Sequence, residues 1–385
     1  MTDPLTPKAR ALCDAMSAAF PPPGDPEALR AAARAGVRPP APSSVTARDG
    51  VAAGVRVRVY TTTAGGRGHG GGPGTADEPG RTASASTSEA RTDAAPTPDR
   101  GPSPDGSRRA GRPRGEPTRT PGRADGGPPL DPVAHVGRPL PGATAHDGRC
   151  PGPGAASPPV VVLAHGGGWV LCDLDTHDGL CRALVERSGA TVVSVDYRRA
   201  PEHRFPAAED DVHTVLTWAA GAYPGRVLVV AGDSSGGNLA AAVALRARDG
   251  DGPALAGQLL FYPVLDHRLD GVSAEAYAEG FFHTAAHMRW YWEQYLGPHG
   301  DPVAASPGLA ADLTGLPPAL VVLADCDPLR DEGLAYARRL SAAGVTAEVR
   351  LHTGMFHGFL GARGILPEAD KALDGAAAWL STLTG

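Results

Sequence analysis

The stretch that decides the fold runs from Arg226 to Arg248 and reads R-V-L-V-V-A-G-D-S-S-G-G-N-L-A-A-A-V-A-L-R-A-R. Its first part, Val227–Ala231, is apolar and rich in β-branched residues, which predicts a buried strand. The run after Gly237 is rich in Ala and Leu, which favours a helix. A G-x-S-x-G sequence between a buried strand and a helix is typical of a nucleophile elbow. We therefore predict that Ser234 is a nucleophile at the tip of a tight turn.

The pentapeptide also fits a second interpretation, a glycine-rich turn that carries a solvated serine. In the nucleophile elbow the turn is too tight for side chains at Gly232 and Gly236, which accounts for glycine at both positions. The nucleophile interpretation therefore requires a base, an acid and an oxyanion hole elsewhere in the chain.

The composition excludes several classes of protein. The chain has 385 residues, enough for one large or two ordinary domains, and its net charge of −6 gives no strong attraction to nucleic acid or anionic membranes. No apolar run approaches the length of a membrane span, and no signal peptide is evident. The five cysteines show no C-x-x-C spacing, which argues against a disulfide framework or a zinc site. We therefore expect a cytoplasmic protein without stable membrane insertion.

The first 60 residues contain short predicted elements. Region 1–50 has helix-compatible apolar spacing at 7–19 and a second short predicted helix at 26–35. Region 51–60 contains V-R-V-R-V-Y, and this alternation predicts a half-exposed strand at the edge of a sheet. We therefore expect two short helices followed by an edge strand of the core at 51–60.

Region 61–159 has a different composition from the rest of the chain. It is mostly Gly, Pro, Ala, Ser, Thr, Arg and Asp, and from Thr61 to Pro129 it contains no Val, Ile, Leu, Met, Phe, Trp or Tyr. Such a segment cannot bury enough apolar surface to offset the entropy of ordering. We predict a disordered, low-complexity insert; a partner-binding tail is the alternative.

Globular sequence resumes at Val160 and continues through residue 385, with strands and helices in alternation. This alternation predicts an α/β fold with a mostly parallel sheet covered by helices on both faces. In such sheets the functional site lies at the carboxyl ends of the strands. The predicted strands are 160–164, 191–197, 227–231, 257–262, 319–324 and 345–351. The predicted helices are 176–188, 206–220, 331–343 and 367–383, with a mostly helical, aromatic-rich segment at 272–296.

A glycine run after strand 160–164 is the candidate oxyanion hole. His165-Gly166-Gly167-Gly168 lets backbone N–H groups converge on one point without Cβ atoms between them, as a developing oxyanion requires. A plain glycine turn and a phosphate-binding loop are the alternatives, but no phosphate-binding glycine motif follows. The N–H of Ser235, directly after the nucleophile, would complete the hole.

Candidates for the acid and the base follow in the order that this kind of site requires. Asp327 comes just after strand 319–324 and before a proline, with Asp325 and Asp331 as alternatives. Asp331 fits better as an acid in the first turn of a helix. His357 follows strand 345–351 and comes after the acid, which distinguishes it from the other histidines.

A metal site is not expected, and no cofactor is predicted. His283 and His287 have the i, i+4 spacing of helical zinc ligands, but Thr284 stands where the H-E-x-x-H motif has its glutamate. Without a third ligand nearby, we expect these two histidines on the surface.

Five motifs together resemble the bacterial hormone-sensitive-lipase-like esterases of the α/β-hydrolase fold. They are H-G-G-G-W at 165–169, D-Y-R-R-A-P-E-H-R-F-P-A-A at 196–208, G-D-S-S-G-G-N-L-A at 232–240, D-P-L-R-D-E-G at 327–333 and H-G-F at 357–359. The resemblance implies an α/β-hydrolase core at 160–385 and a helical cap formed by 1–50 and 266–296. It also implies roles for six residues: the nucleophile Ser234, the acid Asp327, the base His357, and the oxyanion-hole residues Gly167, Gly168 and Ser235.

The chain departs from the family pattern in two places. Ser235 replaces the usual Ala after the nucleophile, which keeps the N–H, and the insert at 61–159 replaces a short connection. The implied function is a serine carboxylesterase that hydrolyses short- to medium-chain acyl esters of small molecules through an acyl-enzyme. A deacylase or amidase of a specialised metabolite would use the same residues. A catalytically silent ligand receptor, similar to the gibberellin receptor, is disfavoured because His357 is present. A homodimer and a role for the insert stay open.

Overall fold

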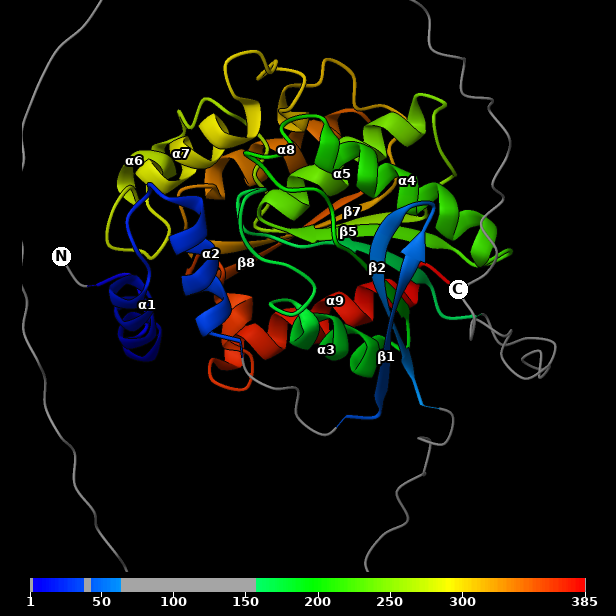
Figure 1. Ribbon diagram of the computed structural model, residues 1–385, viewed down its shortest axis with the longest axis horizontal. Coiled ribbons are helices and arrows are strands. Elements are labelled where there is room, and N and C mark those ends of the chain that lie inside the picture. Colours follow the sequence, from blue (N-terminus) through cyan, green and yellow to red (C-terminus); the bar gives the residue numbers. More distant parts are fainter. Residues whose placement is uncertain (1–2, 38–42, 64–156, 385) are drawn as a thin grey trace, which may run out of the picture. The chain divides into compact units, whose positions relative to one another are not determined.

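The computed structural model describes residues 3–37, 43–63 and 157–384 (Figure 1). All of them belong to the compact unit formed by 1–67 and 136–385. The insert predicted at 61–159 lies outside the described residues, apart from its two ends. Thr61 and Thr62 end a strand, and Pro159 precedes one.

In the described part of the chain, eight strands form one sheet in the order β1-β2-β4-β3-β5-β6-β7-β8. The pairs β1–β2 and β2–β4 are antiparallel, and every other neighbouring pair is parallel. The bounds are β1 Val45–Ala52, β2 Val55–Thr62, β3 Val160–Ala164, β4 Thr191–Val195, β5 Leu228–Asp233, β6 Gly257–Phe261, β7 Ala319–Cys326 and β8 Ala347–Phe356. Every residue of β3, β4, β5 and β6 is buried, as parallel strands covered on both faces require.

Helices cover both faces of the sheet (Figure 1). On one face α3 (Asp178–Ser188) packs against α9 (Pro367–Thr382), and on the other lie α4 (Ala207–Ala222), α5 (Ser235–Arg248) and α8 (Arg330–Ala342). The side chains of β3 alternate between the two cores: Val161 and Leu163 pack with α3 and α9, whereas Val160 and Val162 pack with α4 and α5. The remaining α-helices of the described residues are α1 Pro7–Ala19, α2 Pro26–Ala35, α6 Val272–Ala276 and α7 Ala285–Leu296.

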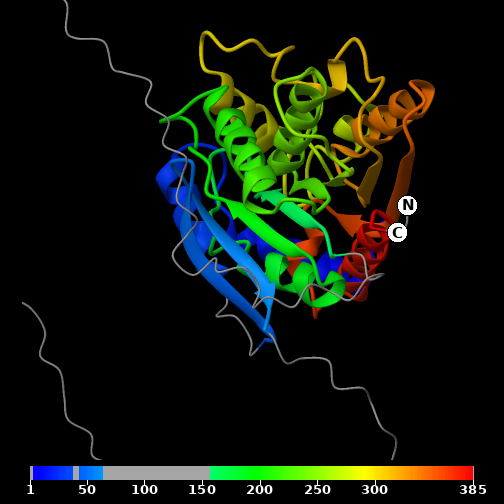
Figure 2. The ribbon, with the colours of Figure 1, turned by 90° about the vertical axis from the view of Figure 1, so that its right-hand side faces the viewer.

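The N-terminal strand prediction needs correction. Region 51–60 was expected to be one edge strand, but the structure has a hairpin in which β1 forms the edge and β2 lies between β1 and β4. Figure 2 shows this hairpin, in blue, along one edge of the sheet. The turn is Ala53–Gly54, with φ of +48° and +92°, which suits a two-residue hairpin turn. Strand β1 (V-T-A-R-D-G-V-A) has no clean alternation, so its sequence did not indicate a strand.

Strand β8 is longer than its sequence suggested. We expected 345–351, but β8 continues to Phe356, which pairs with Cys326 across an irregularity in the register with β7. His357 is therefore the first residue after the strand rather than part of a longer loop. The segment 272–296 also differs in detail, because 277–284 separates α6 from α7.

Within the described residues, no helix is both long enough and apolar enough to cross a membrane. The four cysteines that the structure describes are unpaired.

Candidate active site

Ser234 occupies a strained turn between β5 and α5. Its φ and ψ are +54° and −119°, a combination that a non-glycine residue adopts only when its surroundings impose it. The neighbouring glycines make this turn sterically feasible. A Cβ at Gly232 would lie 2.1 Å from the carbonyl oxygen of Gly236, and one at Gly236 would lie 2.1 Å from that of Ala164. The G-x-S-x-G sequence thus forms the tight strand-to-helix turn that it predicted.

Ser234, His357 and Asp327 form a continuous chain of hydrogen bonds. His357 Nδ1 lies 2.8 Å from Asp327 Oδ2, and His357 Nε2 lies 2.9 Å from Ser234 Oγ. A carboxylate can only accept, so Nδ1 carries the proton and Nε2 is free to accept the serine hydroxyl. The other oxygen of Asp327 accepts the N–H of Leu329 at 2.9 Å, which fixes the carboxylate.

The three side chains come from the carboxyl ends of three different strands. Ser234 directly follows β5, Asp327 directly follows β7, and His357 directly follows β8. Their exposed fractions are 8%, 1% and 2%, so the chain of hydrogen bonds is screened from bulk water. The three positions that the sequence selected are therefore brought together, and a buried Ser–His–Asp arrangement can support nucleophilic attack by the serine.

The alternative acids have other partners. Asp325 lies 3.5 Å from Arg330. Asp331, in the first turn of α8 as expected, accepts the backbone N–H of Ser273 at 2.9 Å. Neither forms a hydrogen bond with His357 among the described contacts.

The glycine run after β3 carries free backbone donors and is joined through Gly166 to Asp233, the residue before the serine. The N–H groups of Gly167 and Gly168 have no hydrogen-bond partner within the described part of the chain. Ser235 is the first residue of α5, where helix geometry leaves the N–H without an intrahelical partner. The carbonyl of Gly167 accepts the N–H groups of Val170 and Leu171, at 3.1 and 2.8 Å, and so closes the loop into a turn. Unused donors in a closed turn suit the binding of an oxyanion.

Asp233 connects the elbow to this glycine loop, and sequence reasoning gave it no role. Its Oδ1 accepts the N–H of Gly166 at 2.9 Å and lies 3.1 Å from His177 Nε2. Burial alone would raise the pKa of Asp233, but His177, His165 and the Gly166 N–H outweigh it and hold that pKa below its usual range. The carboxylate is therefore ionised at neutral pH. Its place inside the G-D-S-S-G motif was the available signal, but the partner His177 is remote in sequence.

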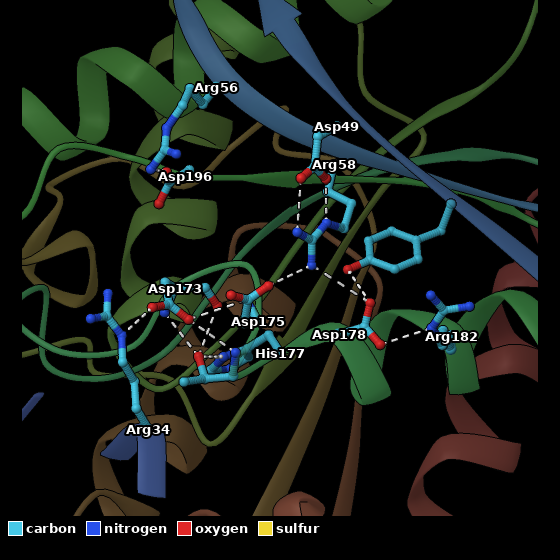
Figure 3. Close-up of polar contacts among 12 residues, drawn as sticks. Arg34, Asp49, Arg56, Arg58, Asp173, Asp175, His177, Asp178, Arg182 and Asp196 are labelled. Carbon is cyan, nitrogen blue, oxygen red and sulfur yellow. Dashed lines mark hydrogen bonds and ion pairs between the residues drawn. The ribbon is translucent and has the colours of Figure 1, made fainter. Parts of the chain in front are cut away.

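A polar network extends from His177 toward the N-terminal elements (Figure 3). Thr176 Oγ1 lies 3.0 Å from His177 Nδ1, and Asp173 Oδ1 accepts the N–H of Thr176 at 3.0 Å. Asp173 also accepts a hydrogen bond from Arg34 of α2 at 2.8 Å. Arg58 of β2 pairs with Asp175 at 2.8 Å in the same loop. Hydrogen bonds and ion pairs thus attach the loop 173–177 to α2 and to the β1–β2 hairpin.

His165 supports the start of the glycine run. Its ring stacks on Tyr197, with centroids 4.1 Å apart and planes 17° apart, and the Tyr197 hydroxyl donates to the His165 carbonyl at 2.8 Å. Burial, together with the nearby His177, lowers the pKa of His165 to about 3. The ring is therefore neutral at ordinary pH and serves as a packed aromatic group.

Segments assigned to a cap from the sequence contact the site. Arg10 of α1 donates to the carbonyl of Gly280 at 2.6 Å, which joins the N-terminal helix to 277–284. The ring of Phe20 lies 5.6 Å from those of Phe282 and His283. The ring of His283 in turn lies 5.3 Å from that of His357. Both segments thus reach His357 or its direct neighbours.

The expectation that His283 and His287 are surface residues was wrong for His287, and His283 is only partly exposed. His287 is buried, with Nδ1 2.8 Å from Thr284 Oγ1 and Nε2 3.2 Å from the carbonyl of Pro21. His283 precedes the helix, which begins at Ala285, so the two rings do not share a helical face. The N-terminal segment covers them, and the sequence spacing could not reveal this cover. Among the described residues, no cluster of three or more metal-ligating side chains was found.

Several known proteins are similar to this chain in sequence and in fold. A family model described as the alpha/beta hydrolase fold matches residues 161–361. Esterase LipI of Mycobacterium tuberculosis is 45% identical over 230 residues, which cover 57% of this chain and 71% of that protein. Ethyl acetate hydrolase of Pseudomonas putida is 38% identical over 224 residues, which cover 55% of this chain and 70% of that protein. The crystal structure of a thermostable esterase from Pseudomonas putida has a TM-score of 0.69 and 28% identity, and the match covers 100% of this chain and 99% of that one. The chain therefore belongs to the hormone-sensitive-lipase-like carboxylic ester hydrolases of the α/β-hydrolase fold.

Proposed function

We propose that the chain is a serine carboxylesterase that hydrolyses short- to medium-chain acyl esters through Ser234, His357 and Asp327. The observation that carries this proposal is the unbroken hydrogen-bond chain, with 2.9 Å between Ser234 Oγ and His357 Nε2 and 2.8 Å between His357 Nδ1 and Asp327 Oδ2. The names of the relatives, an esterase and an ethyl acetate hydrolase, support both the reaction and a short acyl group.

In the first half-reaction, Ser234 Oγ attacks the ester carbonyl carbon while His357 Nε2 takes the hydroxyl proton. Asp327 holds the histidine in the required tautomer and stabilises the imidazolium that forms. The carbonyl oxygen becomes an oxyanion and accepts the N–H groups of Gly167, Gly168 and Ser235. When the tetrahedral intermediate collapses, the C–O bond to the alcohol breaks and His357 protonates the departing oxygen.

In the second half-reaction, water replaces the alcohol. His357 Nε2 takes a proton from water, the resulting nucleophile attacks the acyl-enzyme, and the same N–H groups hold the second oxyanion. Collapse breaks the ester bond to Ser234, returns the proton to its Oγ and releases the carboxylic acid. No metal or cofactor is needed for either step.

The test is Ser234→Ala, assayed with p-nitrophenyl esters of increasing acyl length and with a fluorophosphonate label. We expect the wild type to hydrolyse short esters best and to be labelled, and the variant to lose both properties while unfolding at a similar temperature. Hydrolysis by Ser234→Ala at the wild-type rate would rule out the serine mechanism. Amide or specialised-metabolite hydrolysis with poor activity on simple esters would favour the deacylase alternative. Absence of labelling in the wild type would favour a silent ligand-binding protein.

A further inference from the structure

Two aromatic side chains of the segment 283–291 touch the groups proposed to carry out the reaction. The ring of His283 is perpendicular to that of His357, at an angle of 89° and a centroid separation of 5.3 Å. The ring of Tyr291 packs on Gly168, where a Cβ would lie 2.2 Å from the tyrosine Cγ. The two rings are themselves 5.9 Å apart. One of them therefore borders the base, the other borders an oxyanion donor, and they are neighbours.

Each of these two rings carries a buried polar atom without a partner. His283 Nδ1 and the Tyr291 hydroxyl are among eight such side-chain atoms in the described residues, and both belong to rings that contact catalytic groups. Leaving a buried polar group unpaired costs about 1–3 kcal/mol, so such groups tend to have a use. His287, in the same aromatic cluster, has partners for both ring nitrogens, so this packing does not itself prevent hydrogen bonding.

Both side chains are uncharged near neutral pH. Burial, with His357 and His287 nearby, lowers the pKa of His283 well below its ordinary value, and burial raises the pKa of Tyr291. A neutral imidazole and a phenol offer hydrogen-bond donors and acceptors but no charge. They suit an uncharged oxygen that can both donate and accept, and they offer no counter-charge to a carboxylate or phosphate.

We propose that His283 and Tyr291 form a polar subsite that selects esters carrying a hydroxyl group close to the scissile bond. The inference rests on the proposed serine esterase function and narrows its substrate class. Phe20 and Phe282 pack around the His283 ring, with centroids 5.6 and 4.4 Å from it. A substrate hydroxyl in this subsite forms hydrogen bonds with two polar atoms that the folded protein leaves unpaired, and it brings no charge into the site.

The test compares two matched pairs of esters. In the first pair, ethyl 3-hydroxybutyrate is compared with ethyl butyrate, so the hydroxyl lies on the acyl side. In the second pair, 2-hydroxyethyl butyrate is compared with propyl butyrate, so the hydroxyl lies on the alcohol side. The measurement is the ratio of kcat/KM within each pair, for the wild type, His283→Leu and Tyr291→Phe. Losing one hydrogen bond to the substrate should lower the ratio about fivefold to tenfold in each variant. The pair in which the ratio falls identifies the side of the ester that the subsite reads.

Two controls keep the outcome unambiguous. Tyr291→Phe removes a single oxygen and preserves the ring on Gly168, so it remains informative even if His283→Leu folds poorly. Phe20→Leu disturbs the packing around His283 without removing a polar atom, and its ratios should match those of the wild type. Ratios within about twofold of the wild type in both variants and both pairs would overturn the subsite. A wild type that hydrolyses none of the four esters would instead count against the proposed function.

Discussion

Replacing Asp233 by Asn separates the positioning of the glycine loop from the chemistry of Ser234. The carboxylate accepts the N–H of Gly166 at 2.9 Å and faces His177 Nε2 at 3.1 Å. Asparagine keeps the shape of the side chain, but its amide oxygen is uncharged and accepts hydrogen bonds more weakly. Its NH₂ group is a donor and cannot accept the N–H of Gly166. The change therefore loosens the link between the elbow and the loop without removing any group that touches the substrate.

The size of the effect follows from the hydrogen bonds involved. A hydrogen bond to a charged group contributes about 1.5–3 kcal/mol and a neutral one about 0.5–1.5 kcal/mol, so the substitution weakens the link by about 1–2 kcal/mol. If the loop donors lose that much of their alignment with the oxyanion, kcat should fall about fivefold to thirtyfold. KM should change little, because the donors act mainly on charge that develops in the transition state.

The assay is steady-state hydrolysis of a short p-nitrophenyl ester, with kcat and KM determined separately and unfolding followed by heating. Asp173→Asn is the matched control, since Asp173 is also a buried carboxylate of the same network but holds the 173–176 turn and Arg34 instead of Gly166. We expect it to lose stability with a smaller change in kcat. A kcat for Asp233→Asn within twofold of the wild type, or equal to that of Asp173→Asn, would refute the positioning role.

Three further predictions test other parts of the site, two of them with a matched control variant. Asp327→Asn should lower kcat by roughly 10³-fold to 10⁴-fold, because the histidine loses the partner that fixes its tautomer, whereas Asp325→Asn should behave like the wild type in the same assay. Gly168→Ala should lower kcat/KM at least about a hundredfold, because its Cβ would lie 2.2 Å from an aromatic ring. Gly364→Ala, also at positive φ but with no atom within 4 Å, should keep its activity; equal losses would contradict the steric argument. The free energy of unfolding should fall as pH drops from 6.5 toward 3, by up to about 1.4 kcal/mol per unit from His165. The unfolded chain binds that proton near pH 6.5 and the folded chain near pH 3. The free energy of unfolding of His165→Asn, measured in urea at several pH values, should therefore depend less steeply on pH than that of the wild type. An unchanged pH dependence would contradict this assignment.

The parts of the fold that sequence predicted well are those with local causes. Strand β3 and the elbow were predicted because an apolar run followed by glycines has few other structures available. Strand β1 was missed because its residues do not alternate between apolar and polar, and it becomes a strand by pairing with β2. The end of β8 was missed because the strand continues through an irregular register that no sequence period records.

The candidate site divides in the same way. Ser234, Asp327 and His357 follow strands, and their order along the chain is a property that sequence can show. Asp233 and His283 acquire their importance from partners that are distant in sequence, His177 for the first and Phe20 and His357 for the second. Residue type and spacing therefore identified the three residues of the hydrogen-bond chain but not the residues that surround and align them.

The glycine loop has contacts on two sides, and these contacts relate the alignment of its N–H donors to the proposed choice of substrate. Asp233 holds Gly166 from the side of the elbow, and the ring of Tyr291 presses on Gly168 from α7. A substrate bound to the Tyr291 hydroxyl in the proposed subsite would contact the same ring that borders Gly168, a proposed oxyanion donor. Under this proposal, a hydrogen bond from the substrate should restrain the ring, and the restrained ring should limit the movement of Gly168. The preferred ester should accordingly differ from its alkyl analogue in kcat as well as in KM, because substrate selection and donor alignment share one side chain.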